Sequence, residues 1–118
     1  MKKVVIVDDA AFMRLTLKTM IERNGFEVVG EAENGLRGVA KCKELNPDIV
    51  TMDITMPEMD GIEALKNIRK NNPSASVIMV SAMGQERFIL EAISNGAKGF
   101  LVKPFKEETV ISALNKLL

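Results

Sequence analysis

The sequence predicts a doubly wound α/β sandwich with a parallel five-stranded sheet, on three observations. Short β-branched runs alternate with stretches of helical period along all 118 residues. Several of the runs are apolar almost throughout, which is typical of strands buried on both faces of a parallel sheet. Asn-Pro and Asn-Gly pairs close several of the helical stretches. Five strand–helix units in succession therefore indicate a (βα)5 fold.

The expected strands differ in how apolar they are. The first, third and fourth runs (VVIV, DIVTMD and SVIMVS) are nearly continuous apolar segments, so they suit the interior of the sheet. The second run, FEVVGEA, is more polar and suits an edge. The five runs occupy residues 4–7, 26–32, 48–53, 76–81 and 99–102.

Each strand is followed by a stretch of helical period. In the first, Met13, Leu17, Met20 and Ile21 form one apolar stripe, and Gly25 closes the segment. The remaining stretches are residues 35–45 before Asn46-Pro47, the segment marked by Ile62, Leu65 and Ile68 before Asn72-Pro73, the segment marked by Phe88, Ile89, Ala92 and Ile93 before Asn95-Gly96, and a last one with Val110, Ile111, Leu114 and Leu117 that runs to the C-terminus.

Composition narrows the class of protein. Sixteen basic and sixteen acidic residues give zero net charge, which argues against a general binder of nucleic acid or of membrane surfaces. The chain has no histidine, so histidine-based catalysis and the usual zinc sites are excluded. Its single cysteine, Cys42, is expected to be a packing residue. With no signal peptide and no apolar run of membrane-spanning length, we expect residues 1–118 to be a single cytoplasmic domain.

Functional side chains collect at the ends of the expected strands. Asp8 and Asp9 follow the first strand, Asp53 ends the third, Ser81 ends the fourth and Lys103 follows the fifth. Because parallel strands end at the same edge of a sheet, all five residues are expected to meet at one site.

Each of these residues also has a simpler explanation. Asp9 or Ser81 could cap the helix that follows it, Asp53 could be a turn residue, and Lys103 could be a solvated surface lysine. The joint placement at equivalent strand ends favours a shared site.

Three clustered carboxylates repel one another, and Lys103 offsets only one charge. Oxygen ligands and the remaining negative charge fit Mg²⁺. A carboxylate is already ionised at neutral pH and can accept a phosphoryl group without a general base. Asp53 on the central strand is therefore the expected acceptor, Asp8 and Asp9 the metal pair, and Ser81 a hydroxyl donor.

Four motifs resemble the receiver domain of two-component response regulators: DD at 8–9, MDITMPEMDG at 52–61, SAMG at 81–84 and KPF at 103–105. The resemblance implies a flavodoxin-like sheet of strand order 2-1-3-4-5. It also implies that a histidine kinase phosphorylates Asp53, and that the chain catalyses only its own Mg²⁺-dependent phosphorylation and dephosphorylation.

The resemblance also assigns roles within the site. Asp9, Asp53 and the backbone carbonyl of Thr55 would bind Mg²⁺, and Asp8 would act mainly through water. Lys103 would contact the phosphoryl group, with a cis peptide bond before Pro104.

Other residues would respond to the phosphoryl group. Ser81 would follow it inward and Phe100 would swing with it. Thr55 and Met83 stand where the family tunes phosphoryl lifetime. The candidates for an output surface are Arg87, Phe88, Phe100 and Lys106, although Phe88 could instead be a core residue.

The segments DDAAFMR and SAMGQ are most similar to the stand-alone chemotaxis regulators of this family. This similarity implies a chemotaxis-type histidine kinase, the flagellar motor switch and a phosphatase as partners of a monomeric protein, with no nucleic acid or membrane partner.

Three other functions remain open from the residues. The chain could be a receiver cut from a larger methylesterase or transcription factor. A small Mg²⁺-dependent aspartyl phosphatase would usually carry a second Asp where Thr55 stands. A flavin binder would place a phosphate where Asp8 and Asp9 would repel it.

Overall fold

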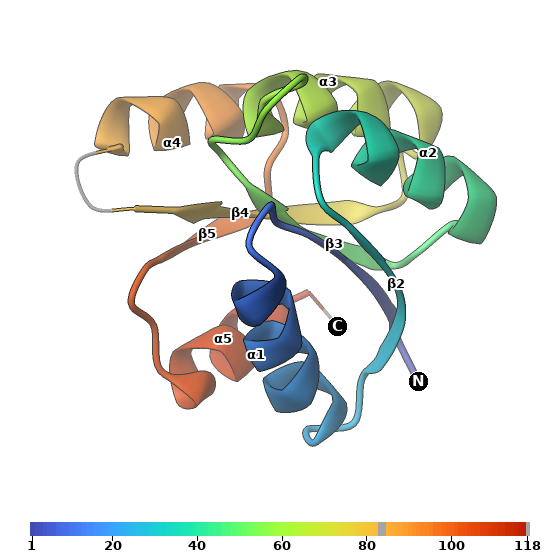
Figure 1. The fold of residues 1–118 in the computed structure, drawn as a ribbon, viewed down its shortest axis with the longest axis vertical. Coiled ribbons are helices and arrows are strands. Elements are labelled where there is room, and N and C mark those ends of the chain that lie inside the picture. Colours follow the sequence, from blue (N-terminus) through green and yellow to red (C-terminus); the bar gives the residue numbers. More distant parts are fainter. Residues whose placement is uncertain (83–84, 118) are drawn as a thin grey trace.

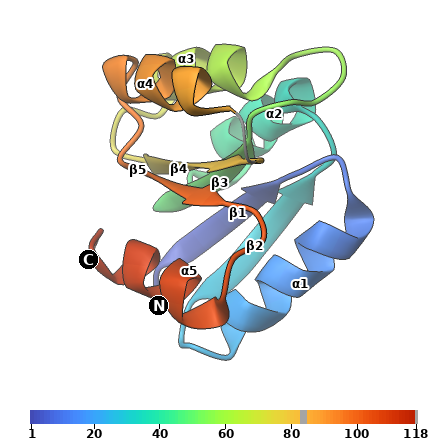
Figure 2. The same cartoon turned by 90° about the vertical axis from the view of Figure 1, so that its left-hand side faces the viewer.

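The computed structural model of the chain describes residues 1–82 and 85–117. Its strands are β1 (Lys3–Val7), β2 (Glu27–Ala32), β3 (Ile49–Asp53), β4 (Ser76–Ser81) and β5 (Gly99–Val102); its helices are α1 (Ala11–Glu22), α2 (Gly35–Leu45), α3 (Gly61–Asn71), α4 (Glu86–Ser94) and α5 (Glu107–Asn115). The parallel sheet has the order β2-β1-β3-β4-β5. Helices α1 and α5 cover one face, and α2, α3 and α4 cover the other (Figures 1 and 2). The predicted fold class and strand order are confirmed.

The sheet separates two hydrophobic cores because side chains alternate along each strand. In β1, Val4 and Ile6 pack in the core beneath α1 and α5, whereas Val5 and Val7 pack in the core beneath α2, α3 and α4. All four side chains are at most 1% exposed. This burial on both faces explains why the run VVIV is apolar throughout. By contrast, most residues of β2 are only half-buried, as expected of the predicted edge strand.

Most element boundaries lie within one residue of where the sequence places them: β1 begins at Lys3 instead of residue 4, and β3 begins at Ile49 instead of residue 48. The second strand begins at Glu27 because the N–H of Phe26 instead donates to the carbonyl of Ile21 in the preceding turn. Helix α5 was expected to run to the C-terminus, but it ends at Asn115.

The start of α3 packs directly on the end of β3. The N–H of Gly61 donates to the carbonyl of Ile54 at 2.7 Å, and Asp60 caps the helix by accepting from the N–H of Glu63 at 2.9 Å. A β-carbon at Gly61 would lie 2.0 Å from the carbonyl oxygen of Asp53. The absence of a side chain at Gly61 therefore allows the helix to approach the strand end that carries Asp53.

The start of β1 and the end of α5 lie near each other, on the side of the molecule away from the carboxyl ends of the strands (Figures 1 and 2). Within the described residues, no helix combines the length and the apolar character that crossing a membrane would need.

Candidate metal and phosphoryl site

Three carboxylates meet at the carboxyl ends of β1 and β3. One carboxylate oxygen from each of Asp8, Asp9 and Asp53 lies within 4.8 Å of the others. The strand pairing explains the placement, because Val7 at the end of β1 is paired with Met52, next to Asp53. The structure thus brings together the three acids that the sequence placed at strand ends.

Asp8 is held by several contacts. Its side chain is 1% exposed, its Oδ1 accepts from the N–H of Ala10 at 2.8 Å, and its Oδ2 lies 3.2 Å from Nζ of Lys103. Arg14 donates to the backbone carbonyl of Asp8 at 2.7 Å and pairs with Glu31 at 3.3 Å. Asp8 is therefore a fixed residue whose carboxylate is already engaged by the protein.

Asp9 is exposed, and its carboxylate makes no hydrogen bond or ion pair with the described residues. The interpretation of Asp9 as a helix cap is wrong, because Ala10 occupies the N-cap of α1 and the helix has no side-chain cap bond. Of the three acids, Asp9 has the carboxylate that is most available to a metal ion.

Asp53 is nearly buried, with 7% of its surface exposed. Burial and, after it, the negative charges of Asp8 and Asp9 raise its pKa from 3.8 to about 6, against the opposing effects of Lys103 and the N–H of Ile54. Nζ of Lys103 lies 3.7 Å from Oδ1 of Asp53. Lys103 therefore bridges Asp8 and Asp53 and is not a free surface lysine.

The charges and donor atoms of this site fit Mg²⁺. Three carboxylates cluster here, and the one ammonium group of Lys103 pairs with two of them, which leaves an excess of negative charge that a hard divalent cation can neutralise. The donors near the centre are oxygen atoms, and the described residues place no thiol there, since Cys42 is buried in the core beneath α2.

The remaining predicted residues surround this centre. Thr55 is exposed in the loop after β3. Ser81 is fully buried, and its hydroxyl donates weakly, at 3.4 Å, to the carbonyl of Leu101 on β5. Ser81 does not cap α4, whose N-cap is Gln85. The Lys103–Pro104 peptide bond is cis, as the family resemblance implied. Met83 lies outside the described residues.

The candidate output residues differ in exposure. Phe100 on β5 is 46% exposed and Lys106 is exposed. Phe88 is half-buried and packs against the core beneath α4, with the guanidinium of Arg87 4.8 Å from its ring centre. Phe88 thus has a core role as well as a partly exposed face.

Sequence reasoning missed Gln85 and Arg14. The side chain of Gln85 bonds both Ala82 and Thr55, and Arg14 fixes the backbone at the end of β1. Neither residue stands at a strand end or in a charge cluster along the sequence, so only the folded arrangement reveals its contacts.

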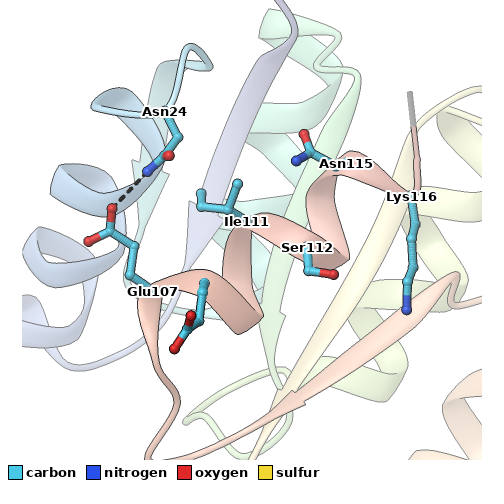
Figure 3. Close-up of a pocket in the computed structure, with 7 residues that line it drawn as sticks. Asn24, Glu107, Ile111, Ser112, Asn115 and Lys116 are labelled. Atoms are coloured by element: carbon cyan, nitrogen blue, oxygen red, sulfur yellow. Dashed lines mark hydrogen bonds between the residues drawn. The ribbon is translucent and has the colours of Figure 1, made fainter.

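A depression of about 770 Å³ lies along α5 (Figure 3), and none of the residues that line it belongs to the site of Asp8, Asp9 and Asp53. Asn24 donates to Glu107 at its rim at 2.8 Å, and Glu107 also pairs with Arg23. These contacts lower the pKa of Glu107 and join the end of α1 to the start of α5. The depression is explained as a packing feature between the two helices.

Comparison with known proteins agrees with the geometry. CheY of Thermotoga maritima, a chemotaxis protein, is 60% identical over 116 residues, which cover 98% of this chain and 97% of that protein. CheY of Bacillus subtilis is 58% identical with the same coverage. The solved complex of CheX, CheY, BeF₃ and Mg²⁺ from Borrelia burgdorferi contains a similar chain, with a TM-score of 0.93 and 40% identity over 98% of this chain and 88% of that one.

The family profile described as the response regulator receiver domain matches residues 4–115, nearly the whole chain. This match includes Asp8, Asp9 and Asp53 (the acidic trio), Lys103 and the cis peptide bond before Pro104. The receiver resemblance noted from the four motifs is confirmed, and the chain belongs to the response regulator receiver domain family.

Proposed function

We propose that this chain is a chemotaxis response regulator that accepts a phosphoryl group on Asp53 from a histidine kinase. The observation that carries the proposal is the acidic trio, in which Asp53 lies beside two further carboxylates and 3.7 Å from Lys103. Full-length similarity to proteins named CheY supports the chemotaxis assignment. The chain is a signalling receiver, and its only catalysis is the gain and loss of its own phosphoryl group.

In the transfer, an oxygen of Asp53 forms a bond to phosphorus while the bond from phosphorus to the histidine nitrogen of the kinase breaks. Asp53 reacts as a carboxylate, so no proton has to leave it. Bound Mg²⁺ would neutralise charge on the phosphoryl oxygens. Lys103 would turn toward those oxygens, and the hydroxyl of Ser81 would leave Leu101 to donate to them.

We assign the metal ligands as Asp9, Asp53 and the backbone carbonyl of Thr55. The assignment of Asp8 to an indirect role through water is supported by its existing contacts with Ala10 and Lys103. Asp9 has no comparable contact within the described residues, which supports its direct binding to the metal.

The output is a change in protein binding. Phosphorylation replaces the single negative charge of the Asp53 carboxylate with a phosphoryl group that carries about −1.5 to −2. We infer that Lys103 and Ser81 then turn toward this group and that Phe100 shifts on the surface formed by α4, β5 and α5. The proposed partners are a chemotaxis-type kinase, the flagellar motor switch and a phosphatase that shortens the signal. We propose that residues 1–118 act as one monomeric receiver in the cytoplasm.

Incubation with acetyl phosphate and Mg²⁺ tests this function. Intact-mass spectrometry should show one added phosphoryl group on the wild-type protein and none on Asp53→Asn. The matched control is Asp48→Asn, because Asp48 precedes β3 at the opposite edge of the sheet, where its carboxylate accepts from the N–H of Lys3. The assignment would be contradicted if Asp53→Asn gained a phosphoryl group, or if Asp48→Asn failed to gain one while Asp53→Asn did.

A further inference from the structure

The side chain of Gln85 joins two loops at the edge of the sheet where Asp8, Asp9 and Asp53 lie. Its Oε1 accepts from the N–H of Ala82, directly after β4, at 2.7 Å. Its Nε2 donates to Oγ1 of Thr55, in the loop after β3, at 2.8 Å. Although Gln85 is the N-cap residue of α4, its side chain makes no cap bond to that helix. The amide group is therefore used to connect the loops and not to start the helix.

The orientation of the Gln85 amide follows from its partners. A backbone N–H can only donate, so the amide oxygen must face Ala82 and the amide nitrogen must face Thr55. The hydroxyl of Thr55 then accepts the second bond. An amide at position 85 satisfies both partners at once, which a side chain of alanine could not do.

The hydrogen bond from Gln85 to Thr55 is important because it fixes Thr55 within the loop that follows β3. At its ends the loop is fixed by backbone bonds of Ile54 to Val80 at 3.1 Å and of Gly61 to Ile54 at 2.7 Å. Among the described residues, the Gln85–Thr55 bond is the one hydrogen bond that ties residues 55–59 to another part of the chain. Thr55 would otherwise be an exposed loop residue with its backbone free to reorient.

We propose that Gln85 is a positioning residue for the metal site, acting through Thr55. This inference rests on the proposed function, in which the carbonyl of Thr55 binds Mg²⁺. Ordering a loop residue opposes ligand binding, and a bond that is present before the metal arrives removes part of that entropic opposition. A single hydrogen bond of ordinary net strength corresponds to about 3- to 10-fold in affinity.

Calorimetric Mg²⁺ titrations of four proteins test the proposal: wild type, Gln85→Ala, Thr55→Val and the double variant. Each single variant should bind Mg²⁺ about 3- to 10-fold more weakly, because each removes the same bond. The double variant should bind no more weakly than the weaker single variant, since the bond can be lost only once. Unchanged affinity in Gln85→Ala, or fold-changes that multiply in the double variant, would overturn the proposal.

Glu86→Ala is the matched control. Glu86 is an exposed residue in the first turn of α4, so its removal weakens the start of the helix without touching the bridge. Its Mg²⁺ affinity should remain within about twofold of wild type. A loss as large as that of Gln85→Ala would assign the effect to α4 as a whole and overturn the positioning role.

Nuclear magnetic resonance provides a second readout, which needs no metal. Gln85 is the only glutamine in the sequence, so selective labelling of glutamine with ¹⁵N gives a single side-chain nitrogen signal, that of Nε2. In metal-free protein, Thr55→Val should shift this signal while Glu86→Ala leaves it in place. A signal that does not respond to Thr55→Val would show that the bridge is absent in solution and refute the proposal.

The same measurements separate this proposal from the proposed function. Asp9→Ala should weaken Mg²⁺ binding far more than Gln85→Ala does. If wild type binds no Mg²⁺, or if Asp9→Ala binds it equally well, the metal site itself fails and the role of Gln85 fails with it. If Asp9→Ala behaves as expected and Gln85→Ala binds like wild type, only the role of Gln85 fails.

Discussion

At the scale of single residues, the ionisation of Asp53 opposes folding when no metal is bound. Its pKa is raised from 3.8 to about 6 by burial and by the charges of Asp8 and Asp9. Well below pH 3.8 the carboxyl is protonated in both the folded and the unfolded chain, so its ionisation does not change the free energy of unfolding. As the pH rises through 4 to 6, the unfolded chain loses the proton first, and the folded state loses relative stability.

Asp53→Asn should therefore stabilise the metal-free protein at high pH. We expect a gain of about 1 to 3 kcal/mol at pH 8 in EDTA, which shrinks toward zero near pH 4. The chain contains no tryptophan or tyrosine, so urea unfolding followed by circular dichroism is the suitable measurement. A gain that is the same at pH 8 and pH 4, or a loss at pH 8, would contradict the raised pKa.

Residues of the site could be predicted from the sequence where their position along a strand fixes their position in space. Asp8, Asp53 and Lys103 stand at strand ends, and parallel strands bring such ends together. The division of work between Asp8 and Asp9 could not be read this way, because it depends on which carboxylate turns inward. The role of Gln85 could not be predicted from the sequence either, because its partner Thr55 is 30 residues away in the chain.

At the scale of elements, the contact between β3 and α3 supports the acceptor. Gly61→Ala should destabilise the fold by about 2 to 3 kcal/mol, because its new methyl group would overlap the backbone of Asp53 and Ile54. The displaced strand end should also slow phosphorylation of Asp53 by acetyl phosphate. Urea unfolding and time-resolved intact-mass spectrometry measure the two effects.

The control for Gly61→Ala is Gly99→Ala. Gly99 begins β5, and a β-carbon there would meet no atom within 4 Å. Its unfolding free energy should change by less than about 0.5 kcal/mol. Equal stability losses in the two variants would show that the close approach at Gly61 is not the cause.

Whole elements were predictable because their signals are strong and local. The period of apolar residues located α2 at 35–45, and Asn46, which ends it, has the positive φ of 47° that favours such a stop. The ends of other elements depend on tertiary contacts. Phe26 is drawn into the core ahead of β2, so a β-branched run alone places the start of that strand one residue too early.

At the scale of the whole molecule, Cys42 reports on global unfolding. Its thiol is fully buried on α2, and burial raises its pKa to about 12. We expect a thiol reagent such as DTNB to label native protein at least about a thousandfold more slowly than the urea-unfolded chain, since a stable domain opens this rarely. Native labelling at the rate of the unfolded chain would show that α2 opens locally.

The start of β1 and the end of α5 lie near each other and away from the edge of the sheet that carries Asp8, Asp9 and Asp53 (Figures 1 and 2). A tether, a fluorescent tag or another domain joined at either end would leave the approach to Asp53 clear. Joining the two ends through a short linker would also require little rearrangement of the fold. The molecule therefore has the geometry of an interchangeable module, because Asp53 remains accessible whichever end carries a tether, tag or further domain.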